Sequence, residues 1–186
     1  MAEELTLQVQ KALAGDQAAM RDLVDRYRDA VFRFCYRMLG QTQDAEDAAQ
    51  ETFVRMLKSL ARWDVNRPFE PWLFAIAGNR CRTALSARQR RFSTAPMSEM
   101  IEETATDDSV DRQRERLLAE EVQNAMSHLR PEYREAFLLF HQQQLAYEDI
   151  AQNMDRPLGT IKTWIRRARQ ELMERLRRRE VVGEAS

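Results

Sequence analysis

Apolar side chains recur every three or four residues along most of the chain, the spacing that gathers them on one face of a helix. Leu23, Tyr27, Val31, Phe34 and Met38 form one such stripe, and similar stripes follow it. An all-α fold is therefore expected. The pattern predicts helices over residues 5–13, 21–39, 44–63, 72–91, 112–129, 132–144, 147–154 and 161–172.

Residues that begin or end helices stand between these stripes. Asp16 is suited to cap the helix that follows it, and Gly40 is suited to end that helix. Near the C-terminus, Pro157 cannot continue a helix and Gly159 supplies backbone freedom, while Thr160 is a fair N-cap. The last two helices are therefore expected to be joined by a short turn, as in a helix-turn-helix.

The final helix is strongly basic outside its apolar face, which is formed by Ile161, Ile165, Ala168 and Leu172. Residues 156–179 hold nine basic side chains against two acidic ones. A short buried face opposite a basic, hydrogen-bonding face is what a helix that reads the DNA major groove requires. A solvated basic helix on an ordinary bundle is the simpler alternative. The spacing of the two helices and the turn between them favour DNA binding over it.

Charge is segregated along the chain. Five arginines and no acid lie between residues 80 and 91, which makes a second basic helix. Residues 93–111 then carry six acids and no lysine or arginine. Like charges at low hydrophobicity indicate a disordered segment. The sequence therefore predicts two small helical domains, residues 1–92 and 112–186, joined by an acidic flexible linker.

Composition and cysteine usage exclude several classes of protein. The 186 residues are 44% hydrophobic and 32% charged, with five glycines and five prolines, which suits a helix-rich soluble protein of net charge −1. The sequence contains no run of about 18 apolar residues, which a membrane-spanning helix would need, and no secretion signal is evident at the N-terminus. A cytoplasmic location is therefore expected. Cys35 and Cys81 are far apart and form no CxxC motif. We therefore expect no disulfide framework, no zinc site and no cofactor.

Three segments resemble those of the extracytoplasmic-function (ECF) sigma factors of bacterial RNA polymerase. Residues 44–60 (DAEDAAQETFVRMLKSL) are similar to the core-polymerase-binding helix of that family. Residues 69–91 are similar to its promoter-melting and minus-ten-reading helix, and residues 129–172 to its minus-thirty-five-reading domain. The resemblance implies a protein that directs core RNA polymerase to specific promoter DNA and helps to open it, without covalent chemistry. It also implies an anti-sigma factor as a partner.

The resemblance places the final helix in the major groove of the upstream promoter element. Arginine can bind guanine bidentately and read sequence, whereas phosphate contacts only position the protein. Trp164 departs from the family's pattern, in which a basic residue is common, and it either contacts DNA or widens the apolar face. The candidates for phosphate and base-edge contacts are Thr160, Lys162, Thr163, Arg166, Arg167 and Arg169.

By the same resemblance, the N-terminal domain opens the duplex and captures an extruded base, which offsets part of an unstacking cost of roughly a few kcal/mol per base. Asn79 stands at the family's base-reading asparagine position. Arg80, Arg82 and Arg88 would hold the backbone of the separated strand. Trp63, in the loop before this helix, would either stack on a base or pack in the core.

The resemblance assigns polymerase binding to the acidic, amphipathic helix at residues 44–60. Asp47, Gln50 and Glu51 on its exposed face would meet the clamp helices of the largest polymerase subunit. Without the resemblance, the same side chains are equally well explained as a solvated helix face.

Two other functions compete with a sigma factor. An enzyme is disfavoured because neither histidine, His128 or His141, has metal-ligand spacing or a plausible nucleophile beside it, and no Walker loop, GxSxG or HExxH motif occurs. A free-standing helix-turn-helix transcription regulator needs only one reading helix and would usually dimerise. The second basic helix at residues 80–91 therefore favours the sigma-factor interpretation.

Overall fold

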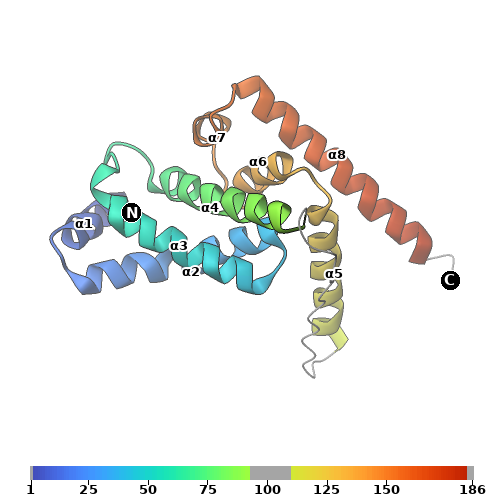
Figure 1. The fold of residues 1–186 in the computed structure, drawn as a ribbon, viewed down its shortest axis with the longest axis horizontal. Coiled ribbons are helices and arrows are strands. Elements are labelled where there is room, and N and C mark those ends of the chain that lie inside the picture. The colour runs from blue at the N-terminus through green and yellow to red at the C-terminus, as the bar shows by residue number, and fades with distance from the viewer. Residues whose placement is uncertain (1, 93–109, 184–186) are drawn as a thin grey trace.

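The computed structural model of the chain describes residues 2–92 and 110–183, so most of the predicted linker, residues 93–109, lies outside the described residues. Throughout the described ranges the regular structure is helical, which confirms the predicted fold class (Figure 1). Residues 110 and 111, predicted as linker, belong to the start of α5. The elements are α1 (Ala2–Leu13), α2 (Gln17–Leu39), α3 (Thr42–Ser59), the 3-10 turn η1 (Leu60–Arg62), α4 (Phe69–Phe92), α5 (Val110–Ser127), α6 (Pro131–His141), α7 (Tyr147–Met154) and α8 (Leu158–Gly183).

In the N-terminal half, α2 packs against α1, α3 and α4. The stripe from Leu23 to Met38 supplies much of its core, where Leu23 and Phe34 are fully buried, and Met56 and Phe74 join them at 0% and 2% exposed. The rings of Phe34 and Phe74 meet edge-on with centroids 5.4 Å apart. Burying one side chain of this size contributes about 1.5–3 kcal/mol, so the cluster stabilises this half of the chain.

The ends of α2 are set as the sequence predicts. The Asp16 carboxylate accepts hydrogen bonds from the backbone N–H groups of Ala18, at 2.8 Å, and Ala19, at 3.2 Å. Gly40 ends the helix in the left-handed region with φ 78°, where a residue without Cβ is unstrained. Both signals are local, which is why the sequence revealed them.

α4 begins three residues earlier than predicted. The Trp63 ring packs edge-on against Phe69 at 5.2 Å between centroids, and Phe69 is 1% exposed. The Tyr27 hydroxyl donates a hydrogen bond to the Glu70 carboxylate at 2.8 Å. These tertiary contacts anchor the first turn of α4 to α2 and η1, and an i, i+3 pattern could not reveal them.

α7 and α8 form the predicted helix-turn-helix, and Ile150, Ile161 and Ile165 are buried within it. The turn is built differently from the prediction, because the left-handed residue that ends α7 is Asp155, with φ 52°. α8 begins at Leu158, so Gly159 and Thr160 lie in its first turn rather than before it. The expected N-cap role of Thr160 is therefore wrong.

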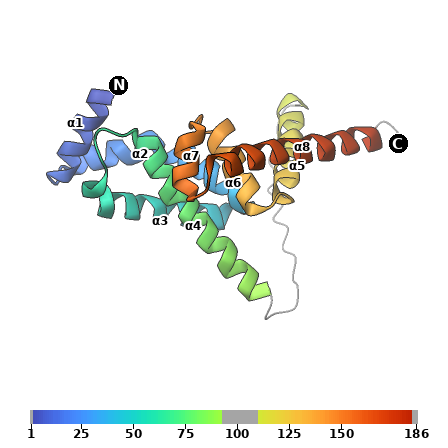
Figure 2. The same ribbon diagram turned by 90° about the horizontal axis from the view of Figure 1, so that it is seen from above.

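The two halves of the chain contact each other. α5 and α6 pack against α2, while α6 and α7 pack against α4 (Figures 1 and 2). The C-terminal part of α8 extends away from this body (Figure 1). Among the described residues, no helix combines the length and apolarity that crossing a bilayer demands.

Candidate nucleic-acid interface

α8 presents its basic side chains on the side opposite its buried face. Ile161, Ile165, Ala168 and Leu172 are at most 8% exposed, as the periodicity predicts. The packing of this stripe fixes the rotation of α8 about its own axis, so the remaining positions face outward. Of the predicted DNA contacts, Thr160 and Thr163 are half-buried, and the exposed ones are Lys162, Arg166, Arg167 and Arg169.

Two of these exposed arginines are held by side chains of α6. Arg167 donates a hydrogen bond to the Tyr133 hydroxyl at 2.9 Å, and Arg169 donates to Nε2 of His141 at 3.2 Å. Burial and the nearby Arg169 charge lower the pKa of His141, which favours the neutral ring that can accept this bond. The basic face is therefore partly ordered before any ligand binds.

The sequence did not identify these supporting side chains. Tyr133 and Arg167 are separated by 34 positions, so no local pattern links them. Lys162 also has a partner that the sequence could not show, because its ammonium lies 5.6 Å from the ring centroid of Tyr147. Such a contact between a cation and an aromatic ring is weakly stabilising at an exposed site.

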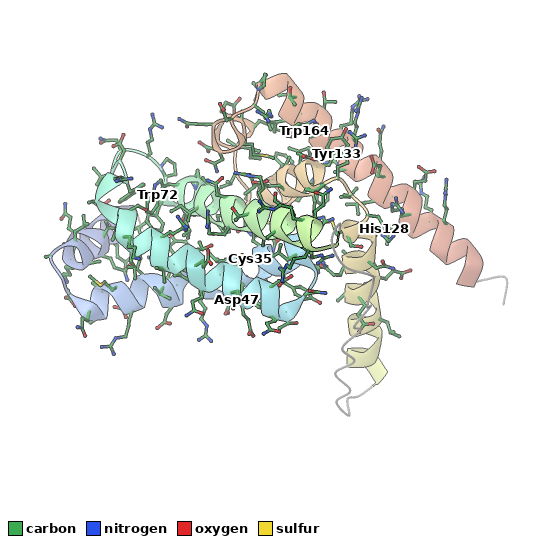
Figure 3. The ribbon with its side chains drawn as sticks, viewed as in Figure 1. Cys35, Asp47, Trp72, His128, Tyr133 and Trp164 are labelled. Carbon is green, nitrogen blue, oxygen red and sulfur yellow. The ribbon has the colours of Figure 1, made fainter. Side chains whose placement is uncertain are left out.

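Trp164 lies against Tyr133, with ring centroids 6.1 Å apart (Figure 3). It is half-buried and packs on the core cluster. Of the two roles left open by the sequence, this environment favours widening the apolar face of α8.

The four predicted minus-ten residues on α4 lie around the helix, and in this conformation each is engaged within the protein. Arg80 pairs with Glu51 at 3.3 Å, which links α4 to the predicted polymerase-binding helix α3. Arg82 pairs with Glu135 of α6 and donates to the Asn79 side-chain oxygen. Arg88 donates to the Leu39 carbonyl at 3.2 Å. The structure thus brings Asn79 and Arg82 together, and Glu135 of α6 reaches Arg82.

Trp63 is in the core in this conformation. It is 8% exposed, and its indole Nε1 is buried with no hydrogen-bond partner among the described residues. A buried donor without a partner is costly, because its hydration is lost and not replaced. A ring in this position supports the loop before α4, and stacking on a base would first require it to move.

The three predicted polymerase contacts lie on the outer face of α3. Asp47 (Figure 3), Gln50 and Glu51 are exposed, while their neighbours Ala48, Ala49 and Thr52 face the core. Glu51 is the member that also touches α4, through its ion pair with Arg80.

The two thiols and the acidic side chains do not form a reactive or metal-binding centre in the described part of the chain. Cys35 and Cys81 are both buried and unbridged. A hydrogen bond with Cys35 and burial raise the pKa of the Cys81 thiol, which keeps it protonated. Within the described residues, no three His, Cys, Asp or Glu side chains are grouped so that they could hold a metal ion.

Comparison with known proteins shows which protein family the chain is similar to. Residues 23–91 match the family model of Sigma-70 region 2, and residues 119–172 match that of Sigma-70 region 4. The ECF RNA polymerase sigma factor SigW of Bacillus subtilis is 30% identical over 179 residues, covering 91% of this chain and 95% of the relative. An ECF RNA polymerase sigma-E factor of Haemophilus influenzae is 30% identical over 189 residues, covering 95% and 98%.

Two solved structures support the fold. The sigma factor RpoE of Bartonella quintana, determined in complex with the anti-sigma factor NepR, superposes with a TM-score of 0.69 at 23% identity, covering 84% of this chain and 96% of that one. CnrH, solved in complex with the cytosolic domain of CnrY, gives a TM-score of 0.66 at 24% identity, covering 91% and 95%. With two matching family models and relatives aligned over nearly their whole length, the chain belongs to the ECF family of RNA polymerase sigma factors.

Proposed function

We propose that this sigma factor holds one promoter at two places, with residues 1–92 reading and opening the minus-ten element and residues 112–186 reading the minus-thirty-five element. One observation carries the proposal: the basic helices α4 and α8 belong to segments matched by different sigma regions. One reading helix suffices for a simple regulator, whereas two suit a protein that spans separated elements. Residues 93–111 would tether the two domains.

At the upstream element, α8 would enter the major groove. The ordered Arg167 and Arg169 suit contacts that need a fixed geometry, because less side-chain freedom is lost when they bind. Arg166 is exposed and shows no such contact with the described residues, so it suits a contact that forms only on DNA. The remaining candidates, Thr160, Lys162 and Thr163, would contribute contacts to phosphates and base edges.

At the minus-ten element, Asn79 would read an extruded base while Arg80, Arg82 and Arg88 hold the strand. Asn79 is exposed, as a base-reading side chain must be. The polymerase would bind the outer face of α3 through Asp47, Gln50 and Glu51. The chain would supply specificity and strand opening, and the polymerase would supply the chemistry.

Regulation by an anti-sigma factor is proposed by analogy with structural neighbours. RpoE was solved in complex with the anti-sigma factor NepR, and CnrH in complex with the cytosolic domain of CnrY. We expect an equivalent protein to bind this chain in the cytoplasm and to block its access to polymerase.

Run-off transcription tests the proposed function. Purified chain with core RNA polymerase and a random promoter library should give promoter-specific transcripts, while the chain alone binds promoter duplex weakly. Asn79→Ala should reduce permanganate reactivity of the opened strand and leave polymerase binding intact. Tight, specific duplex binding by a dimer without polymerase would instead favour a free-standing transcription regulator.

A further inference from the structure

The Tyr133 hydroxyl is a fixed hydrogen-bond acceptor for the basic face of α8. Tyr133 of α6 is 5% exposed, and its ring packs against Trp164 (Figure 3), while the Arg130 guanidinium lies 5.6 Å from its centroid. A ring packed in this way has little room to turn, because protein interiors are dense. The hydroxyl that accepts from Arg167 at 2.9 Å therefore stays in place. The orientation of the Arg167 guanidinium is thus set by α6 as well as by α8.

His141 holds Arg169 only while its ring is neutral. Arg169 donates to Nε2 of His141 at 3.2 Å, and because a guanidinium has no acceptor, Nε2 must carry no proton. The ring packs against Phe137 and Phe140, with centroids 4.4 Å and 4.9 Å away. Burial and the Arg169 charge both lower the pKa of His141, which favours the neutral ring. Protonation would turn this acceptor into a donor and set two cations side by side.

The charges that α8 brings to this part of α6 and α7 are positive. Arg169 is the charged group that acts on the His141 ring. Tyr147 of α7 stacks on Phe140 with centroids 4.6 Å apart, and the Lys162 ammonium lies over the Tyr147 ring. A proton on His141 would therefore add a positive charge to an already cationic surface. Attraction to DNA phosphates would not fall, although the hold on Arg169 would be lost.

We propose that Tyr133 and His141 are positioning residues that orient Arg167 and Arg169 for reading base edges in the upstream element. This inference rests on the proposed DNA contacts of the two arginines. Each guanidinium donates one N–H group to its acceptor on α6 and keeps its other donors for DNA. A bidentate contact with guanine needs two N–H groups aimed at O6 and N7, so it depends on the orientation of the guanidinium plane.

A phosphate contact is less demanding. It requires a positive charge near the DNA backbone and carries no sequence information. Loss of an acceptor on α6 should therefore lower the preference for one base over another more than it lowers total DNA binding. A side chain that only supports the fold would lower both together.

Tyr133→Phe and His141→Phe remove the two acceptors and keep an aromatic ring at each position. Phenylalanine lacks only the hydroxyl of tyrosine, and at position 141 it suits the neighbouring rings of Phe137 and Phe140. His141→Gln is the rescue variant, because its side-chain carbonyl can accept from Arg169 and does not titrate. Far-UV circular dichroism checks that each variant stays helical.

Two further variants are matched controls. Tyr147→Phe makes the same chemical change as Tyr133→Phe, but Lys162 contacts the ring of Tyr147, which phenylalanine retains. His128→Gln removes the other histidine of the chain, which is exposed on α5. Both should leave base preference as it is in the unaltered chain.

Each full-length chain is assembled with core RNA polymerase and incubated with a library of random promoter duplexes, and the bound duplexes are sequenced. Enrichment at each upstream position measures base preference, and the bound fraction measures total binding. Tyr133→Phe and His141→Phe should each lower the enrichment at a subset of upstream positions about fivefold, as the loss of one hydrogen bond would. Total binding should change less than about twofold, because the charges remain. His141→Gln should retain the enrichment.

A pH series on the unaltered chain tests His141 without a substitution. Selections at about pH 8 and about pH 5.5 lie on either side of the ordinary pKa of histidine, about 6.5. At the lower pH, enrichment should fall about fivefold at the positions that His141→Phe affects, as for the loss of one hydrogen bond, while total binding does not fall. His141→Gln should show no such change, and His128→Gln should behave like the unaltered chain.

Unchanged base preference in either phenylalanine variant would overturn the role of the residue that it replaces. A uniform decrease in binding with base preference intact would also overturn it, because such a decrease indicates contacts with phosphates alone. A loss of preference at low pH that persists in His141→Gln would overturn the role of His141. The proposed function fails by a different result, namely the absence of any upstream base preference in the polymerase complex of the unaltered chain.

Discussion

Arg134→Met should destabilise the protein more than most single substitutions of a charged residue. Arg134 is 6% exposed, and its guanidinium donates to three carbonyls, those of Met38, Ser127 and Leu129. It thereby joins the ends of α2 and α5 to α6. Methionine has a similar reach and an apolar end, so the substitution removes the donors while leaving most of the volume filled.

The expected loss follows from the three bonds. Burial and the nearby Arg88 charge lower the pKa of Arg134, which means that the charge bears a desolvation cost where it stands. Hydrogen bonds to charged groups usually contribute about 1.5–3 kcal/mol each. Because of the desolvation cost we take about 1 kcal/mol for each of the three bonds, which gives a total of about 3 kcal/mol. For a chain of this size, that corresponds to a decrease of roughly 6–12 °C in Tm.

Urea unfolding followed by circular dichroism measures this difference in the free energy of unfolding. Arg33→Met is the matched control, because Arg33 is exposed on α2 and should change stability by less than about 0.5 kcal/mol. Arg134→Lys should recover only part of the loss, since one ammonium group cannot replace a planar fork of donors. If Arg134→Met were as stable as Arg33→Met, the three bonds would not contribute as reasoned.

Three further predictions concern single sites. Asp16→Ala should lower the free energy of unfolding by about 1 kcal/mol because α2 loses its N-cap, and an unchanged urea midpoint would contradict this. Arg166→Ala should weaken use of the upstream element and lower the salt dependence of DNA binding by about one unit of slope, whereas identical activity across a panel of swapped promoters would assign Arg166 to a solvated face. Because the folded pKa of His141 is below its unfolded value, the unfolded chain binds more protons between the two, so stability should fall as pH drops through about 6.5. His141→Gln should flatten that decrease, and an unaltered pH profile would show that other groups cause it.

The sequence by itself determined the helices, several of their ends and the position of the two basic segments. The stripe from Leu23 to Met38 and the cap at Asp16 rely on residues a few positions apart, so the information is local and visible in order along the chain. The apolar stripe of α8 likewise fixed which of its residues face outward, and the burial of Ile161 and Ile165 follows that pattern.

Only the tertiary structure decided what those outward side chains meet. Packing places Glu135 of α6 against Gly78 and Arg82, which is 53 positions away along the chain, and no local pattern links these residues. Trp63 could stack or be buried, and Phe69 settles its environment in this conformation. Which polar side chains pair, and which lose their water, depends on which helices pack together. Helical periodicity shows only which side of each helix is apolar, and it does not show which element covers that side.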